Sequence, residues 1–512
     1  MKLTRIAVAI ASTCGALASA PAFAVTADQY SNTGEFTGST LNIRISGASA
    51  QDNGILGSAL SLCVAGTVHR YAISNNFVFY CTPDVGTNAG QIQLPTRAAS
   101  NGGPINKLAI YKYSVGGAGL GVTPINSTNA AADGSTSGDG ARLPFLDLTK
   151  IAASCTGTNA ALTNPTFGPG TNGSYNNVAC GNASSALTTP AVSYVGVSDL
   201  EPAFFSNKTS NINAVSATAL IFGPIVTKNV YDRLQTLQGL STPSCGVTLD
   251  SEGCMPSLSS AQLASLYTQP FQTWSGVGVP GLADDSVYVA RRVNSSGTEK
   301  TFEALIAHTP NSDAQFKSCN VGTEQIVQPD SGTLLGDNEA LCTTSVSNPT
   351  APTIFAGAGG GNVRNCLTNH QAQGRSAIGI LTTEDKPNAS WRFVKVDGVA
   401  PNQANTASGR YRFYTEASLN TRIGGAIATL SAEGYPAFIS RLSNDFANKA
   451  IIKQINGLDQ TFGAAGLMAL LSRQTVAPDT TPDYTGANSI IPWTKLVGGT
   501  TVDNCQAPKA VF

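Results

Sequence analysis

Charged side chains are scarce in this chain of 512 residues. Asp, Glu, Lys and Arg together make up 12% of it, and 30 basic residues face 31 acidic ones. Such an even balance provides no basic surface for nucleic acid and no attraction to an acidic membrane. The chain is still 42% hydrophobic, which is too apolar for a disordered protein. Gly, Ser, Thr and Asn take the place of charge, as in many exported, loop-rich proteins.

Catalytic and metal-binding motifs are missing as well. The chain has three histidines and contains no H-E-x-x-H, G-x-S-x-G or C-x-x-C sequence. A secreted hydrolase is therefore unsupported, and we expect neither an enzyme nor a cofactor. Cys366 and His370 have the C-x3-H spacing of a zinc site. Because no C-x-x-C accompanies them, disulfide bonding is the favoured role of the cysteines.

Long apolar runs are absent beyond the first few residues. The chain opens with Lys2 and Arg5, continues with an apolar run from Ile6 to Ala18, and reaches Ala22-Phe23-Ala24. This order is typical of a secretory signal peptide and predicts cleavage after Ala24. The run is too short to span a membrane. We expect a mature chain that begins at Val25, lacks a membrane span and is periplasmic or extracellular.

The cysteines left after this cleavage are even in number. Of the 11 cysteines, Cys14 lies in the signal peptide, so ten remain. An even number in an exported chain favours disulfides. Nearness in sequence predicts three local pairs, Cys63–Cys81, Cys155–Cys180 and Cys245–Cys254. Four cysteines stay unassigned, namely Cys319, Cys342, Cys366 and Cys505.

The most informative stretch is Arg292-Val293-Asn294-Ser295-Ser296-Gly297-Thr298. The apolar run from Ser286 to Ala290 predicts a strand before it, and the segment from Thr298 to Ala307 predicts a helix after it. The unpaired N–H groups at a helix start attract anions, and Gly297 lets a ligand come close. Ser296 and Thr298 add hydroxyls, and Arg292 adds a fork of donors suited to an oxyanion. The same residues also fit an ordinary helix cap beside a surface arginine.

Three further predicted strands end in small or polar residues. They are Leu41–Ile45, which leads through Ser46–Gly54 into a helix from Ile55 to Val64; Lys107–Tyr113, which leads into a glycine-rich loop from Ser114 to Gly119; and Ala191–Val197, which ends at Ser198-Asp199. Each is also explained as a plain connection, a turn or a helix cap. Alone, therefore, none of them identifies a site.

The remaining patterns concern the organisation of the chain. Loop-rich insertions are predicted at about 124–189 and 310–367. Apolar runs at Ala219–Thr227 and Trp391–Val396 predict strands that cross between two lobes. Near the C-terminus, one helical pattern holds Phe446 and Ile451, and a second runs from Phe462 to Leu471.

Taken together, these segments resemble the phosphate-binding periplasmic proteins of ABC transporters, in the class II periplasmic-binding-protein superfamily. That family carries an R-x-x-x-S-G-T turn, which the turn from Arg292 to Thr298 matches in identity and spacing. Four further elements follow the family order, namely the small-residue loop Ser46–Asp52, the Gly-x-Ser-Asp segment Gly196–Asp199, the helix-and-Trp pattern Leu258–Trp274 and the Ala-Ile-Gly strand Ala377–Gly379. The resemblance extends from Asn42 to about Tyr414.

The resemblance implies an α/β fold of two lobes with loop-rich insertions. Lobe I would hold residues 25–219 and 401–512, and lobe II residues 220–400. Phosphate or a related tetrahedral oxyanion would lie in the cleft, where Asp199 would accept a proton from the anion and so disfavour fully deprotonated sulfate. The implied ligand-binding residues are Ser49, Ala50, Gln51, Ser114, Asp199, Arg292, Ser296, Gly297 and Thr298.

The first loop departs from the family pattern. Gln51-Asp52 stands where the family has Thr-Phe, and Asp52 would oppose an anion if it pointed inward. Two functions therefore stay open. One is a monomeric solute-binding protein that serves an ABC transporter permease. The other is an extracellular structural or interaction protein that keeps the fold without transport.

Overall fold

The chain is seen in a computed structural model that describes most of it beyond the N-terminus and several loops. The described residues are 40–64, 66–73, 75–86, 105–126, 142–151, 160–163, 174–179, 187–205, 209–247, 250–269, 273–307, 342, 353–423, 435–456, 466–474, 480–498 and 501–511. The expected signal peptide, the pair Cys155–Cys180 and much of the two insertions lie outside these residues.

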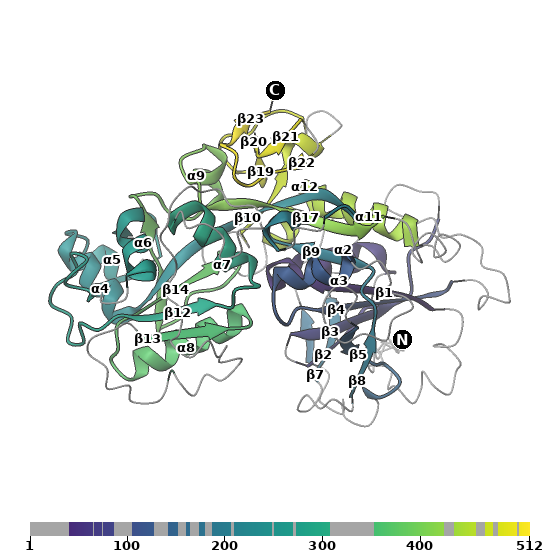
Figure 1. Ribbon diagram of the computed structural model, residues 1–512, viewed down its shortest axis with the longest axis horizontal. Coiled ribbons are helices and arrows are strands. Elements are labelled where there is room, and N and C mark those ends of the chain that lie inside the picture. The colour runs from purple at the N-terminus through teal and green to yellow at the C-terminus, as the bar shows by residue number, and fades with distance from the viewer. Residues whose placement is uncertain are drawn as a thin grey trace, which may run out of the picture.

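A 15-stranded mixed sheet runs through the molecule with helices packed on it, which confirms the α/β class (Figure 1). Its order is β13-β12-β14-β10-β17-β9-β1-β4-β3-β2-β7-β6, while β15 and β18 also pair with β10, and β19 pairs with β18. The strands are β1 (Thr40–Gly47), β2 (His69–Ile73), β3 (Asn76–Cys81), β4 (Lys107–Tyr113), β6 (Ala160–Thr163), β7 (Ser174–Ala179), β9 (Val195–Ser198), β10 (Ile212–Thr227), β12 (Tyr288–Arg292), β13 (Thr353–Gly357), β14 (Ala377–Thr382), β15 (Trp391–Phe393), β17 (Tyr414–Arg422), β18 (Leu467–Leu470) and β19 (Ile490–Ile491).

Two strands join the two halves of this sheet. The β1 half is β1 to β4, β6, β7 and β9, and the β12 half is β12 to β15. The first part of β10 pairs antiparallel with β17, which pairs in turn with β9. The last part of β10 pairs with β14 and β15 in the β12 half. Figure 1 shows the halves side by side, with β10 extending across both.

One predicted crossing strand is placed differently. Ala219–Thr227 lies within β10, as expected, but Trp391–Val396 does not return to the other half. Among the described strands, β15 pairs with the end of β10, at Ile225 to Thr227, and Trp391 is buried in the β12 half. The strand that returns is β17. An apolar run predicts a buried strand, but a strand within one half is buried as completely as one that crosses between the halves.

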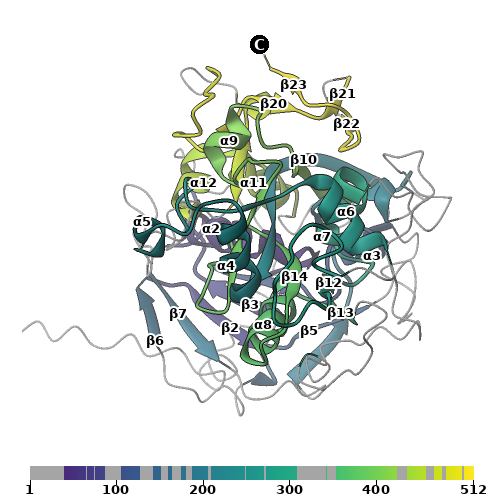
Figure 2. The ribbon, with the colours of Figure 1, turned by 90° about the vertical axis from the view of Figure 1, so that its left-hand side faces the viewer.

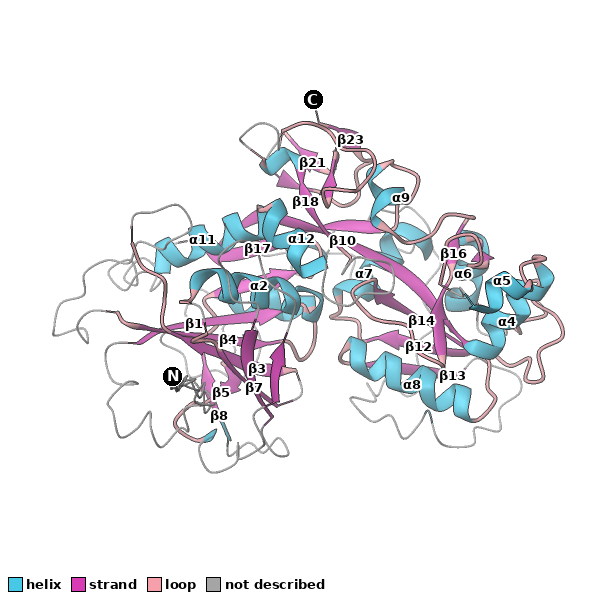
Figure 3. Ribbon diagram, turned by 180° about the vertical axis from the view of Figure 1, so that it is seen from behind, coloured by secondary structure: helices cyan, strands magenta, loops and turns pink. Residues whose placement is uncertain are grey.

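The helices cover the faces of the sheet. They are α2 (Asp52–Leu62), α3 (Thr123–Asn126), α4 (Lys228–Leu237), α5 (Pro243–Val247), α6 (Ser260–Thr268), α7 (Gly297–Phe302), α8 (Gly360–Ala372), α9 (Gln403–Ala407), α11 (Tyr435–Ala447) and α12 (Lys449–Asn456). Figure 3 shows α2, α11 and α12 together over the β1 half, where they contact one another. The start of α6 is a capping box of Ser259 and Gln262.

The second helical pattern near the C-terminus is wrong in its described part. Leu467–Leu470 forms β18, which pairs with β10 through Ala219 and Met468. All four residues of β18 are buried, so the run is apolar on both faces and lacks the alternation of a half-exposed strand. The first pattern is confirmed, with Phe446 in α11 and Ile451 in α12.

The remaining short strands belong to small separate sheets. They are β5 (Leu143–Leu146), β8 (Thr188–Ala191), β11 (Ser257–Leu258), β16 (Lys395–Val396), β20 (Trp493–Thr494), β21 (Leu496–Val497), β22 (Thr501–Val502) and β23 (Lys509–Ala510). Figures 1 and 2 both place β20 to β23 at the end of the molecule where the chain finishes, above β10. None of the helices in the described part of the chain has the length and hydropathy needed to cross a bilayer.

The disulfides follow the prediction where they are described. Cys63–Cys81 and Cys245–Cys254 are bonded, which confirms two of the local pairs. Cys342 is bonded to Cys366, a pair that sequence separation alone did not assign. Cys505 is disulfide-bonded too. Disulfides of this kind are typical of exported proteins.

Candidate functional site

The turn after β12 lies at the junction between the two halves, where Asn294 and Ser295 are exposed and the residues on either side of them are buried. Arg292 is the last residue of β12, Ser296 is the N-cap residue of α7, and Gly297 and Thr298 begin that helix. The Ser296 side chain makes no capping hydrogen bond, and its hydroxyl has no partner among the described residues. The turn is thus not stabilised by the side-chain cap that its sequence also allowed.

Arg292 is held in place from the neighbouring strand. Its Nε donates to the carbonyl of Gly357 at 3.2 Å, and its Nη2 donates to the carbonyl of Ala358 at 2.7 Å. Both carbonyls lie at or just beyond the end of β13, which runs parallel to β12. Two fixed N–H directions leave the guanidinium in one orientation, as a positioned anion-binding group requires.

Asp199 reaches the same turn from the β1 half. It follows β9 directly and is 3% exposed. A Cβ atom on Gly297 would lie 2.3 Å from Asp199 Oδ2, so only glycine fits there. Burial raises the pKa of Asp199 to about 7, although Arg292 and Lys112 lower it. Asp199 and the start of α7 therefore meet, as the resemblance implied.

The first loop brings Gln51 to Asp199. Ser49–Gln51 is a short 3-10 helix that leads into α2, and Gln51 is buried. The Gln51 side chain lies close enough to lower the pKa of Asp199. Neither atom of its amide reaches hydrogen-bond geometry with a described residue, and neither does Asp199 Oδ1. We call Gln51, Asp199, Arg292 and Ser296 the cleft cluster.

Asp52 does not stand as an unbalanced negative charge. Lys112, which is fully buried in β4, places its Nζ 3.1 Å from Asp52 Oδ1. The same Nζ donates to the carbonyls of Gly47 and Ala48 at 3.0 and 3.1 Å. The Lys112 ammonium therefore offsets the repulsion expected from Asp52. No sequence motif marks this lysine, and the available signal was that a lysine inside an apolar strand is unusual.

Ser114 belongs to this ion pair. Its hydroxyl donates to Asp52 Oδ1 at 2.7 Å and accepts from Lys112 Nζ at 2.6 Å. Since a hydroxyl has one proton, Ser114 is committed to Asp52 in this arrangement. Burial raises the pKa of Asp52 and lowers that of Lys112, so burial disfavours the ionised form of both groups, and their mutual attraction opposes this.

A cavity of about 440 Å³ opens beside the cleft cluster. Four of the nine predicted binding residues line it, namely Ser49, Ala50, Arg292 and Thr298. The other five, Gln51, Ser114, Asp199, Ser296 and Gly297, are buried and do not line it. The rest of the wall is Asp52, Asn53, Asn75, Gly360, Gly361, Arg364, Leu381, Thr382, Glu384, Asp385 and Lys386.

Sequence reasoning missed the charged part of this wall. Arg364 in α8 forms an ion pair with Asp385, and Glu384 and Lys386 flank that aspartate. Burial raises the pKa of Glu384 to about 8, and Asp52 raises it further while Arg364 lowers it. These residues follow β14 or lie in the first turns of α8, where no motif marks them.

The two halves touch directly around the cluster. Ser295 Oγ donates to the carbonyl of Gly116 at 2.6 Å, and the Gly119 N–H donates to the carbonyl of Ser295 at 2.8 Å. On another side, Asn53 Nδ2 donates to Glu384 Oε2 at 3.0 Å. The glycine-rich loop after β4 therefore closes on the turn after β12.

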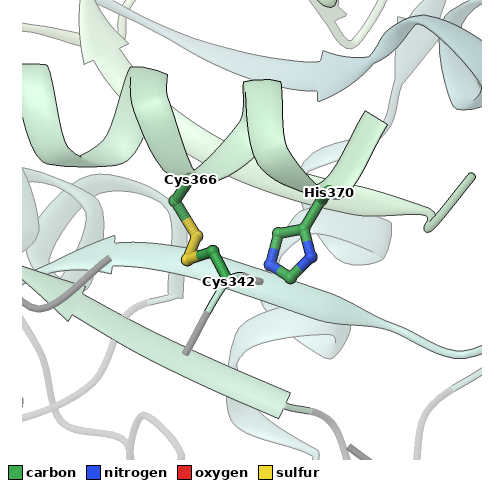
Figure 4. Close-up of side chains that lie close together, drawn as sticks. All are labelled: Cys342, Cys366 and His370. Atoms are coloured by element: carbon green, nitrogen blue, oxygen red, sulfur yellow. A yellow bond between two sulfur atoms is a disulfide. The ribbon is translucent and has the colours of Figure 1, made fainter. Parts of the chain in front are cut away.

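The C-x3-H spacing does not make a zinc site in this structure. Figure 4 shows Cys342 and Cys366 joined through their sulfur atoms, with His370 beside them. A cysteine in a disulfide has no thiolate to offer a metal. Burial lowers the pKa of His370 to about 4, and its ring packs against Tyr288. The cluster is a disulfide that attaches Cys342 to α8.

Comparison with known proteins finds only distant similarity to solved structures. No family model matches the chain, and no curated protein matches it either. Among solved structures, a phosphate ABC transporter substrate-binding protein of Clostridium perfringens with bound phosphate is 15% identical and has a TM-score of 0.29 over 50% of this chain and 77% of that one. An ABC-type phosphate transport receptor of Vibrio cholerae is 14% identical, with a TM-score of 0.29 over 50% and 79%. Similarity at TM-scores this low does not assign a ligand or a partner to this chain.

Proposed function

We propose that the protein is an exported solute-binding protein that holds phosphate or a related tetrahedral oxyanion between two lobes. The observation that supports this most is the cleft cluster. Gln51, Asp199 and Ser296 each carry a buried polar atom without a partner among the described residues, beside the fixed guanidinium of Arg292. Buried polar groups are rarely left unpaired, and a bound ligand is one of the few explanations.

Each group has a distinct part in binding. Arg292 supplies charge, and the Ser296 and Thr298 hydroxyls and the Gln51 amide supply donors. Ser49 and Ala50 form the facing wall. Asp199 accepts a proton from an anion that still carries one, so that phosphate and arsenate are preferred over sulfate. The protein acts by binding, without catalysis.

The lobes of this proposal are discontinuous in sequence. Lobe I takes residues 25–219 with 401–512, and lobe II takes 220–400. The pairing of β10 with β17, and of β17 with β9, supports a chain that leaves the first lobe and returns to it. The partner that receives the solute is an ABC transporter permease.

Calorimetric titration of the mature protein with phosphate, arsenate and sulfate tests this function. We expect phosphate and arsenate to bind and sulfate to bind far more weakly. Arg233→Ala, on α4 away from the cavity, serves as a matched arginine control and retains the affinity of the unmodified protein. Absence of binding heat with all three anions would reject the proposal.

A second function is favoured by one observation. The hydrogen bonds of Ser295 with Gly116 and Gly119, and of Asn53 with Glu384, join the halves through the protein's own groups. A junction held in this way suits an extracellular interaction protein that keeps the fold and does not open for a solute. Small-angle scattering with and without phosphate separates the two, because a solute-binding protein changes its radius of gyration on binding.

A further inference from the structure

The cavity beside the cleft cluster is larger than a single oxyanion requires. Pockets of roughly 300–1,000 Å³ hold drug-sized molecules, and this one measures about 440 Å³. It extends from Arg292 and Thr298 to α8 and to the segment after β14. Phosphate is a single tetrahedral group and would fill only part of this cavity. A ligand that fills the cavity therefore has further groups attached to its phosphate.

The extra space has walls from both halves. Gly360, Gly361 and Arg364 of α8 line it from the β12 half, and Asn53 and Asn75 line it from the β1 half. The two sides meet at the start of α8, where a Cβ atom on Gly359 would lie 2.6 Å from Asn75 Nδ2. This part of the cavity therefore lies between the two halves.

The chemistry of this wall excludes an apolar occupant. None of the described residues that line the cavity is aromatic, and only Ala50 and Leu381 are apolar. Asn53, Asn75 and Thr382 present amides and a hydroxyl instead. Neither a stacked ring nor an alkyl chain finds matching surface here, whereas hydroxyl groups find donors and acceptors.

The charges of the wall are largely balanced. Arg364 is paired with Asp385, and Asp52 is paired with Lys112. Burial raises the pKa of Glu384 to about 8, so at neutral pH its carboxyl mostly carries a proton and can donate a hydrogen bond. Arg292 lines the same wall and brings a guanidinium to it, which suits one phosphoryl group on an otherwise neutral body.

We propose that the ligand is a phosphate monoester of a sugar or another polyol. Its phosphoryl group lies at Arg292 and Thr298, and its hydroxyl groups lie against Asn53, Asn75 and Glu384. The inference rests on the proposed function, because it uses the same anion site, and it extends that function from an inorganic to an organic phosphate.

Calorimetric titration of the full mature protein with four probes tests the inference. The probes are inorganic phosphate, glucose 6-phosphate, phenyl phosphate and glucose. We expect glucose 6-phosphate to bind at least about tenfold more tightly than inorganic phosphate, since two or more added hydrogen bonds are worth this much. Phenyl phosphate gains nothing over inorganic phosphate, and glucose alone does not bind.

Two variants locate the effect. Asn75→Ala removes an amide from the wall. We expect it to lower the affinity for glucose 6-phosphate by roughly 3- to 10-fold more than the affinity for inorganic phosphate. Arg292→Ala lowers the affinity for both glucose 6-phosphate and inorganic phosphate. Arg233→Ala changes neither and controls for general effects of substitution.

The outcomes separate the inference from the function beneath it. If inorganic phosphate binds and glucose 6-phosphate binds no more tightly, the inference is wrong and the proposed function stands. If phenyl phosphate matches glucose 6-phosphate, the polyol part of the inference is overturned. If no phosphate compound binds, both the inference and the proposed function are rejected.

Discussion

Two buried polar clusters lie at the junction between the halves, and they differ in how completely their groups are paired. The cleft cluster lies beside the cavity, which Arg292 lines. The other, which we call the crossing-strand cluster, consists of Glu201, Glu416, Lys495 and Asn504 and joins β17 to the C-terminal segment. Both combine carboxylates with a basic side chain and amides, so composition alone does not distinguish them.

In the crossing-strand cluster the polar groups are extensively hydrogen-bonded. Glu416 accepts from the Lys495 N–H at 2.6 Å and from Ser216 Oγ at 3.1 Å. Asn504 donates to Glu201 Oε2 at 2.7 Å and to the carbonyl of Glu416 at 3.0 Å, and it accepts from the Glu416 N–H at 2.8 Å. Lys495 Nζ donates to the carbonyl of Tyr414 at 2.7 Å.

The difference separates a structural cluster from a binding cluster. A satisfied buried network rigidifies the strands that it joins. An unsatisfied one costs stability and is retained where a ligand completes it. Glu201 and Asp199 are two residues apart in the chain, yet Glu201 accepts from Asn504 while Asp199 keeps one buried oxygen without a partner among the described residues, so position in sequence does not decide the matter.

The largest expected effect comes from breaking the crossing-strand cluster. Glu416→Ala leaves the Lys495 N–H and the Ser216 hydroxyl without their acceptor, and it removes the carboxylate charge beside the buried Lys495 ammonium. We expect the free energy of unfolding to fall by roughly 3–5 kcal/mol, measured by urea denaturation. Asp232→Ala, which removes an exposed ion pair with Lys228, is the control and changes it by less than about 1 kcal/mol. A Glu416→Ala variant as stable as this control would contradict the structural role.

For Arg292→Ala we expect a loss of phosphate binding instead of a loss of stability. Loss of a charged donor from a desolvated site costs on the order of 2–5 kcal/mol of binding, which is about 30-fold to several thousand-fold in Kd for phosphate. Calorimetry measures this loss. Unchanged phosphate affinity in the variant would show that Arg292 only stabilises the loop after β13.

Asp199→Asn sharpens the comparison through selectivity. The amide still accepts a hydrogen bond from the anion but no longer repels a dianion. We expect phosphate affinity to fall by about tenfold and sulfate to bind more nearly as well as phosphate. Competition between the two anions in calorimetric titrations measures the ratio. An unaltered preference for phosphate would remove Asp199 from the site.

The smallest effect concerns pH. Burial raises the pKa of Asp199 to about 7 and that of Glu384 to about 8, so the folded protein holds protons that the unfolded chain releases from about pH 4 upward. Stability therefore falls as pH rises toward 8, by about 1 kcal/mol between pH 7 and pH 8. Urea titrations across this range measure the slope. Asp199→Asn with Glu384→Gln should flatten it, and an equal slope in the double variant would show that other groups titrate.

The parts of the candidate site that the sequence indicated are those set by local pattern. Arg292, Gly297 and Thr298 lie within one strand-to-helix turn, and a turn of seven residues has a recognisable pattern. Asp199 and Gln51 also follow predicted strands, and the structure brings them to that turn.

The parts that escaped prediction depend on long-range contacts. Lys112 and Asp52 lie on different elements, and only the parallel pairing of β1 with β4 places them together. Arg364 and Asp385 meet through the packing of α8 on β14. Short apolar runs were ambiguous for the same reason. The patterns of Leu467–Leu470 and Trp391–Phe393 indicate that these segments are buried, but they do not indicate which elements pack against them.

A crystal structure of the mature protein grown with phosphate tests the central claim most directly. We expect tetrahedral density within about 2.7–3.2 Å of the Arg292 guanidinium and the Thr298 hydroxyl, in contact with at least one of the buried atoms of Gln51, Asp199 and Ser296 that lack a partner among the described residues. Density elsewhere, or a cleft cluster whose polar atoms pair with one another and exclude the anion, would contradict it.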